Sequence, residues 1–128
     1  MKKKVLIVVS DYYKDIAEPL LKSTKKFLNK NTTLNIIKVP GVFEIPVIIS
    51  KNIKKFDGFV AIGCVIKGKT AHFDLISKSV IDAIMNISID NKKPVGNCVL
   101  TCFNYKQALD RKNKGKEAAL ALNSILYE

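Results

Sequence analysis

Short continuous runs of apolar residues alternate along the chain with longer stretches whose apolar residues recur at helical spacing. The continuous runs are rich in β-branched residues, which is typical of strands covered on both faces in a parallel sheet. We expect four such strands, at residues 4–10, 33–39, 58–66 and 94–100. The helical spacing predicts helices at residues 15–28, 43–54, 73–89, 105–111 and 115–127.

Strand and helix alternate four times, and this order predicts parallel strands joined by helical crossovers. The expected fold class is α/β: a three-layer α/β/α sandwich, flavodoxin-like, with a four-stranded parallel sheet. The 128 residues suffice for one hydrophobic core but are few for a two-domain enzyme. We therefore expect a single domain over residues 1–128, with an active site that is shallow or shared with another subunit.

Charge is the most unusual feature of the composition. Lysine and arginine total 22 against 11 aspartates and glutamates, which gives a formal net charge of +11. Clustered basic residues are typical of nucleic-acid binding, but here they are spread over predicted helix faces and turns, and Arg111 is the only arginine. We interpret the excess as solvated surface charge and expect no nucleic-acid partner.

Membrane proteins and disulfide-bonded or metal-binding proteins are also disfavoured. No continuous apolar run reaches 18 residues and no long apolar leader is visible, so we expect a soluble cytoplasmic protein with no membrane partner. Cys64, Cys98 and Cys102 are odd in number and lack metal-binding spacing. They are expected to be reduced core thiols, with no metal site.

Candidate ligand-binding residues follow each predicted strand, at residues 11–13, 39–44, 67–72 and 101–104. The carboxyl ends of parallel strands meet at one edge of a sheet, so these segments should converge there. Tyr12 or Tyr13 would stack on a flat ring or cover the edge of the core. Glu44 would bind ligand hydroxyl groups or cap its own helix.

The segment 67–72, Lys-Gly-Lys-Thr-Ala-His, predicts a tight polar turn before a helix. Such a helix start offers unpaired N–H groups and a positive dipole end to an anion. His72, the chain's one histidine, stands beside this turn, where its imidazole would exchange protons near neutral pH, although a lone histidine is more often structural. Arg111 either ends a solvated basic helix or clamps a phosphate for a neighbouring subunit.

Residues 63–70 match the P-loop pattern G-x-x-x-x-G-K-T letter by letter. In a true P-loop the residues between the glycines form an exposed loop around a phosphate, whereas residues 64–66 are apolar and favour a continuing strand. No convincing strand ending in aspartate follows to complete a magnesium site. A nucleotide-binding P-loop is therefore disfavoured, while the argument for an anion site remains.

Four segments closely resemble the 6,7-dimethyl-8-ribityllumazine synthase family, which catalyses the penultimate step of riboflavin biosynthesis. They are V-P-G-V-F-E-I-P at residues 39–46, A-I-G-C-V-I-K-G-K-T-A-H-F-D at 61–74, V-L-T at 99–101, and Q-A-L-D-R with N-K-G-K-E-A-A within 107–119. These segments span most of the chain in the family's order. The combination of the first two is far more specific than the P-loop string within it.

The resemblance implies a transferase that joins 5-amino-6-(D-ribitylamino)uracil to 3,4-dihydroxy-2-butanone 4-phosphate and releases phosphate and water, without a metal or organic cofactor. A flavin-like ligand-binding module without turnover is the alternative. His72 would transfer protons. The residues implied to bind the pyrimidine substrate are Tyr12, Val42, Phe43, Glu44, Cys64, Val65 and Ile66. Those implied to bind the phosphorylated substrate are Lys69, Thr70, Arg111 and Lys114.

The chain departs from the family's pattern at three places. Asn97 stands where a neighbouring subunit often contributes a Phe that closes the ring pocket, so backbone contacts would persist while stacking is lost. Lys112 alone separates Arg111 from residues 113–115, where many members have a longer connection, and the arm before the first strand is very short. The family's basic unit is a pentamer, and some members assemble into icosahedral shells. We expect a homopentamer with active sites shared between adjacent subunits.

Overall fold

A computed structural model describes residues 2–128 and contains one sheet of four parallel strands in the order β2-β1-β3-β4. The strands are β1 (Lys3–Ser10), β2 (Thr32–Val39), β3 (Gly58–Ile66) and β4 (Val95–Cys102). The helices are α1 (Lys14–Phe27), α2 (Ile45–Lys51), α3 (His72–Asn91), α4 (Tyr105–Leu109) and α5 (Lys114–Leu126), with a 3-10 turn, η1 (Val42–Glu44), before α2. This architecture confirms the predicted flavodoxin-like fold class.

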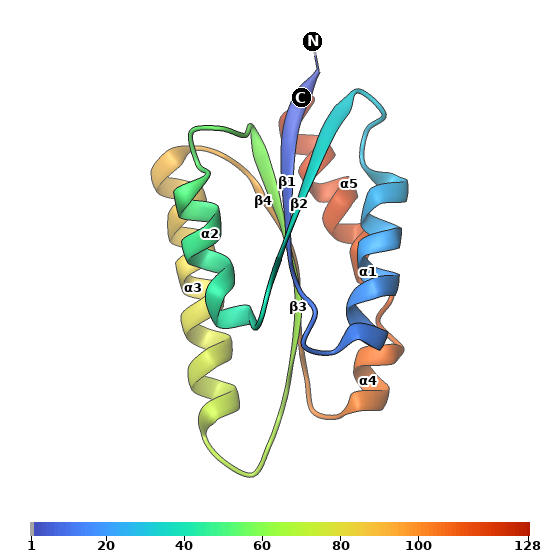
Figure 1. The fold of residues 1–128 in the computed structure, drawn as a ribbon, viewed down its shortest axis with the longest axis vertical. Helices are drawn as coiled ribbons and strands as arrows, with labels where there is room; N and C mark the ends of the chain where they lie inside the picture. The colour runs from blue at the N-terminus through green and yellow to red at the C-terminus, as the bar shows by residue number, and fades with distance from the viewer. Residues whose placement is uncertain (1) are drawn as a thin grey trace.

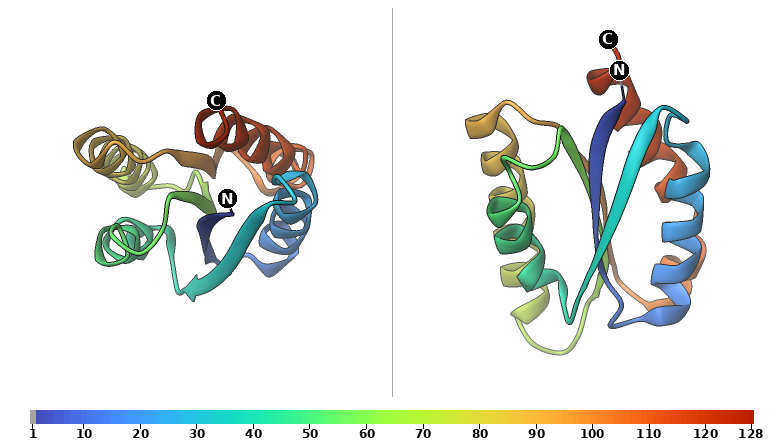
Figure 2. Two further views of the ribbon diagram at one scale, coloured as in Figure 1. Left: turned by 90° about the horizontal axis from the view of Figure 1, so that it is seen from above. Right: turned by 45° about the horizontal axis from the view of Figure 1, so that its top comes forward.

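The helices cover both faces of the sheet (Figure 1). Helices α1, α4 and α5 lie on one face, while α2 and α3 lie on the other, so that the sheet forms the middle of three layers when seen from above (Figure 2). Every connection between paired strands is a helical crossover, as parallel pairing requires. The carboxyl ends of all four strands therefore meet at one edge, at the bottom of Figure 1.

The two central strands explain the continuous apolar runs of the sequence. In β1, Val5, Ile7 and Val9 pack into the core on the α1/α5 face, whereas Leu6 and Val8 pack into the core on the α2/α3 face. Successive side chains of a strand point to opposite faces, so a strand covered on both sides must be apolar at every position. The edge strand β2 is less covered than the central strands, since four of its eight residues are exposed and only Val39 is buried.

The boundaries of several predicted elements differ from the structure by two residues or more at one end. The helix predicted at residues 43–54 divides into η1 and the shorter α2, with Pro46 in the first turn of α2, where its missing N–H is tolerated. The fourth strand continues two residues beyond Leu100, to Cys102. The helix expected at residues 105–111 ends at Leu109, which leaves Arg111 in the turn before α5.

Close packing of α5 against α1 fixes the direction of the last helix. At Gly115 an added Cβ would lie 2.6 Å from the carbonyl oxygen of Leu20, so any larger side chain would push the helices apart. The hydroxyl of Thr24, a fully buried residue, donates to the Leu20 carbonyl at 2.8 Å. The same hydroxyl lies 3.4 Å from the Gly115 carbonyl, and this contact holds the start of α5, and with it Lys114, against α1.

We predict that Lys92→Gly stabilises the protein. Lys92 ends α3 in the left-handed region, with φ 54° and ψ 39°, where a Cβ costs about 1 kcal/mol that glycine avoids. Urea unfolding should show a free energy of unfolding raised by about 1 kcal/mol. The matched control Asn91→Gly, one residue earlier inside the helix, should lower it by a few tenths of a kcal/mol. A lower stability for Lys92→Gly would contradict the prediction.

Candidate active site

The main cavity lies at the carboxyl ends of β1 and β3, where the strand order of the sheet changes direction. Ligands of open α/β sheets bind at such switch points because the chains leave the two strands toward opposite faces. The cavity has a volume of about 530 Å³. It is lined by Ser10, Tyr12, Tyr13, Gly41, Val42, Phe43, Cys64, Val65, Ile66, His72 and Ile76. Seven of the thirteen predicted site residues are therefore gathered here.

Aromatic side chains form one side of the main cavity. Tyr12 is 73% exposed, and the edge of one ring meets the face of the other where Tyr12 contacts Tyr13, at 4.9 Å between centroids and 85° between planes. Tyr13 in turn contacts Tyr105, whose hydroxyl donates to Asp15 at 3.2 Å. Tyr13 is thus packed on both sides, while Tyr12 has free ring surface to offer a ligand.

The turn η1 forms a second side and presses directly on β3. A Cβ at Gly63 would lie 2.5 Å from Cγ1 of Val42, so only glycine permits this approach. Phe43 is 61% exposed beside the cavity. Glu44 does not line the cavity; its Oε1 accepts the N–H of Gly41 at 2.9 Å. Two roles were expected for Glu44, capping its own helix or binding ligand hydroxyl groups. In this structure its carboxylate caps the turn.

The back wall is strand β3 itself. Cys64, Val65 and Ile66 end the strand, so the residues that matched a P-loop do not form a loop around a phosphate. Burial, together with the neighbouring Cys102 thiol, raises the pKa of the Cys64 thiol to about 12. The wall is therefore neutral near pH 7 and suits the flat apolar face of a ring.

The loop from β3 to α3, residues 67–71, is open and exposed, unlike the tight turn that we expected. The Lys67 N–H donates to the Cys102 carbonyl at 2.9 Å, and the His72 N–H donates to Oγ1 of Thr70 at 3.3 Å. Lys69 and Thr70 line neither this cavity nor the one described next, but they directly precede His72, which does line the main cavity. The loop that the sequence predicts to bind an anion thus faces solvent beside the imidazole.

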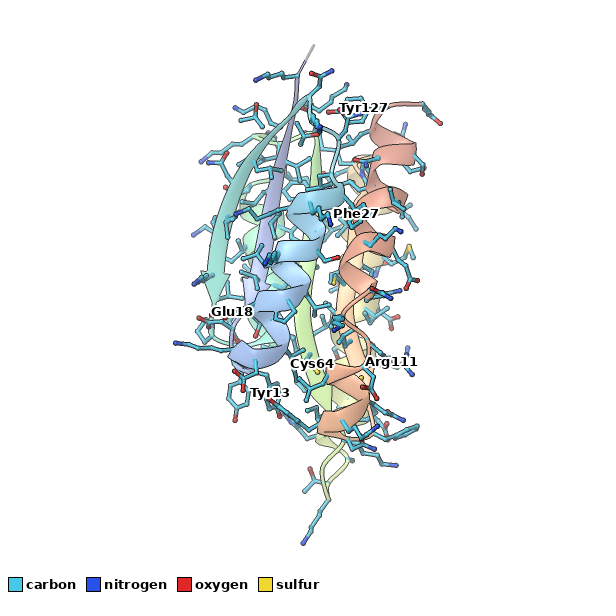
Figure 3. All side chains as sticks on the ribbon, turned by 90° about the vertical axis from the view of Figure 1, so that its right-hand side faces the viewer. Tyr13, Glu18, Phe27, Cys64, Arg111 and Tyr127 are labelled. Atoms are coloured by element: carbon cyan, nitrogen blue, oxygen red, sulfur yellow. The ribbon has the colours of Figure 1, made fainter. Side chains whose placement is uncertain are left out.

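A second cavity, which we call the edge cavity, lies beside the unpaired edge of β4 and the turn between α4 and α5. Its volume is about 400 Å³. It is lined by Asn97, Val99, Leu100, Thr101, Asp110, Arg111, Asn113, Lys114 and Glu117. The structure therefore gathers the predicted residues Asn97, Arg111 and Lys114 here and not around His72. Figure 3 shows Arg111 at the same end of the molecule as Tyr13 and Cys64.

Asn97 has a structural partner within its own strand. Its Oδ1 accepts the N–H of Val99 at 3.0 Å, which satisfies a backbone donor that the missing neighbouring strand leaves free. Asn97 is exposed and lines the edge cavity. Asn97 therefore offers the edge cavity a polar group where the family often has an aromatic ring.

Several cavity-lining residues were not predicted. Tyr13 was left as an alternative to Tyr12, and the structure places both in the main cavity. Ile76 follows His72 by one helical turn, a spacing that would have identified it. Asp110 of the edge cavity adjoins Arg111, but its carboxylate pairs with Lys106 at 3.3 Å on the surface.

Residues 2–128 contain neither a membrane-crossing helix nor a metal-binding cluster. In this part of the chain no helix combines the length and apolar character needed to cross a membrane. Nor do three or more His, Cys, Asp or Glu side chains gather there in a way that would hold a metal ion. The three cysteines are free and buried, which confirms the prediction of reduced core thiols.

Comparison with known proteins identifies the family. A sequence profile described as 6,7-dimethyl-8-ribityllumazine synthase matches residues 2–127. The 6,7-dimethyl-8-ribityllumazine synthase of Bartonella henselae is 42% identical over 127 residues, covering 91% of this chain and 82% of the relative. That of Corynebacterium kroppenstedtii is 38% identical over 126 residues, covering 92% and 79%. That of Buchnera aphidicola subsp. Baizongia pistaciae is 39% identical over 132 residues, covering 93% and 82%.

The chain belongs to the 6,7-dimethyl-8-ribityllumazine synthase family. The resemblance inferred from its motifs is thereby confirmed, and a P-loop nucleotide-binding protein is no longer favoured. The matched region contains both cavities, so the family's lumazine synthase fold carries the entire candidate site.

We predict that Cys64 reacts slowly with thiol reagents although it lines the cavity. With a pKa of about 12, about one Cys64 in 10⁴ is a thiolate at pH 8, against roughly a quarter for an ordinary thiol. Native protein treated with Ellman's reagent at pH 8 should release almost no colour within minutes, and the rate should rise about tenfold per pH unit up to pH 11. In guanidinium chloride all three thiols should react at once. Rapid modification of Cys64 in the native protein would disprove the prediction.

Proposed function

We propose that this chain is a transferase of riboflavin biosynthesis that condenses 5-amino-6-(D-ribitylamino)uracil with 3,4-dihydroxy-2-butanone 4-phosphate to 6,7-dimethyl-8-ribityllumazine. The observation that carries the proposal is that an apolar, aromatic-sided cavity of about 530 Å³ and an exposed Lys-Gly-Lys-Thr loop flank the same imidazole, that of His72. The cavity would fit a flat heterocycle, and the loop would fit a phosphate. The family of the chain is the independent support.

The pyrimidine would lie against β3. Its ring would contact Cys64, Val65 and Ile66 on one side, while Tyr12 would stack on the ring with the face that Tyr13 leaves free. Val42 and Phe43 would close the pocket at η1. Glu44, whose Oε1 already accepts the Gly41 N–H, has its second carboxylate oxygen for ribityl hydroxyl groups.

The phosphate of the four-carbon substrate would bind at the loop that precedes α3. The first intrahelical hydrogen bond of α3 runs from the Leu75 N–H to the Ala71 carbonyl, and the His72 N–H donates to Thr70, so the N–H groups of Phe73 and Asp74 would be offered to an anion. Lys69 would contribute its backbone N–H, and Thr70 its hydroxyl. A bound phosphate next to His72 favours the protonated imidazole, which can then donate a proton to a leaving group.

The reaction needs little more than orientation and proton transfer. The 5-amino group adds to the ketone, and loss of water gives an imine. Elimination of inorganic phosphate follows, and the ribitylamino nitrogen closes the second ring with loss of another water. Each of these steps moves protons, so one imidazole near neutral pH and two oriented substrates suffice.

The position of Arg111 supports a homo-oligomer with shared sites. Arg111 and Lys114 line the edge cavity, whereas His72 lines the main cavity, so within one chain the phosphate clamp and the proton carrier are apart. A heterologous contact that brings the edge cavity of one copy to the main cavity of the next would unite them. Heterologous contacts form a closed ring when the rotation between neighbours closes. The proposed pentamer is such a ring.

The first test is the reaction itself. Wild-type protein mixed with both substrates should form the fluorescent lumazine well above the slow uncatalysed rate. His72→Ala should lower kcat by about 10²-fold or more with a small change in KM, because it removes proton transfer and leaves the cavity walls in place. Lys78→Ala, an exposed change on the same helix, is the matched control and should be neutral. An unchanged kcat in His72→Ala would remove this residue from the mechanism.

The second test asks whether sites are shared. His72→Ala and Arg111→Ala should each be nearly inactive alone, but particles made by co-expressing both should recover up to about a quarter of wild-type activity, since that share of interfaces unites two intact halves. Co-expression of His72→Ala with His72→Gln is the control and should recover nothing. Absence of recovery in the first pair would place the whole site within one chain, and native mass measurement would distinguish five chains from a larger shell.

A further inference from the structure

The loop of residues 67–71 is weakly held by its own atoms. All five residues are exposed, and a Cβ placed on Gly68 would meet no atom within 4 Å. A loop with this much freedom must be ordered when an anion binds, and the lost freedom weakens binding. Whatever fixes the two ends of the loop therefore bears on phosphate affinity.

Phe103 contacts both ends of this loop. It lies between β4 and α4 and is 65% exposed, whereas the loop connects β3 to α3. The Lys67 ammonium lies 5.5 Å from the centroid of its ring, a cation–π distance. The ring of Phe73, in the first turn of α3 beside His72, lies 6.4 Å from it at 32°. One ring thus contacts the residue that opens the loop and the residue that follows the imidazole.

The backbone around Phe103 is itself fixed. The Phe103 N–H donates to Oε1 of Gln107 at 2.8 Å, and the Gln107 N–H donates to Oδ1 of Asn104, the residue that caps α4, at 2.9 Å. The adjacent Cys102 carbonyl accepts the N–H of Lys67 at 2.9 Å. Phe103 is therefore an anchored platform, although most of its ring faces solvent.

We infer that Phe103 is a positioning residue for phosphate binding. Its ring holds Lys67 and Phe73, and through them it keeps residues 68–72 in the arrangement that receives the phosphate beside His72. The inference rests on the proposed function, which supplies the phosphorylated substrate. Phe103 would contact neither substrate and would affect phosphate affinity only by holding the loop.

The expected effect is moderate. An exposed cation–π contact and an aromatic pair each change an equilibrium by only a few-fold. Apparent affinity scales with the fraction of loops that are already in the binding arrangement. Loss of the ring should therefore raise the dissociation constant for a phosphate about three- to tenfold.

The experiment compares Phe103→Ala with Phe103→Tyr in the full chain. Calorimetric titration with inorganic phosphate should give a dissociation constant raised about three- to tenfold in Phe103→Ala and unchanged in Phe103→Tyr, which keeps the ring. In steady-state kinetics, Phe103→Ala should raise KM for the phosphorylated substrate and leave KM for the pyrimidine unchanged. Lys78→Ala, a change of an exposed charged residue on the outer surface of α3, is the control and should alter neither.

A double-mutant cycle tests whether Phe103 acts through Lys67. Lys67→Met keeps the length of the side chain and removes its charge, and its effect on the phosphate dissociation constant should shrink when Phe103 is already alanine. Equal effects in both backgrounds, an unchanged constant in Phe103→Ala, or no phosphate binding by the wild type would each overturn the inference. The expected pattern with inorganic phosphate but no lumazine formation would uphold the inference and reject the proposed reaction instead.

Discussion

The pairing of β1 with β3 is the interaction on which the rest of the structure depends. The strand order reverses at this pair, so the chain leaves β1 toward one face of the sheet and β3 toward the other. The main cavity opens between these two departures. Both strands are covered on both faces, so the register that places Val9 beside Ile62 is also the register that fixes the cavity wall. Stability and binding geometry therefore come from the same apolar residues.

The opposite edge of the sheet supports the proposed association with another copy of the chain. Strand β4 has a partner on one side, β3, and its other side carries the edge cavity with Arg111. The chain uses the Asn97 side chain to satisfy the exposed Val99 N–H, a local solution to an unpaired strand edge. Apolar side chains on α3 and α5 remain exposed, among them Met85, Ile89 and Ile125. Such surfaces, next to an incomplete set of ligand-binding groups, are what association with another copy would cover.

The sequence predicted those features that follow from periodicity. Central strands were recognisable because residues 5–9 of β1 and nearly all of β3 are apolar, and His72 could be placed because it follows the end of a buried strand. The bond from Gly41 to Glu44 was not predictable, since a carboxylate near a helix start has either interpretation until its hydrogen bond is seen. The openness of residues 67–71 was also missed, because it depends on long-range packing that no local pattern encodes.

The two substrates would meet parts of the site that differ in rigidity. The ring wall at Cys64 is part of a buried strand, so binding there orders nothing further and its affinity depends on shape. The phosphate loop is exposed, so its affinity depends on how far its ends are fixed before the ligand arrives. A substitution in the strand would therefore alter the shape of the cavity. A substitution beside the loop would alter only the fraction of molecules whose loop is in the binding arrangement. Sequence variation should accordingly be easier to accommodate around Phe103 than at Gly63, where an added Cβ has no room.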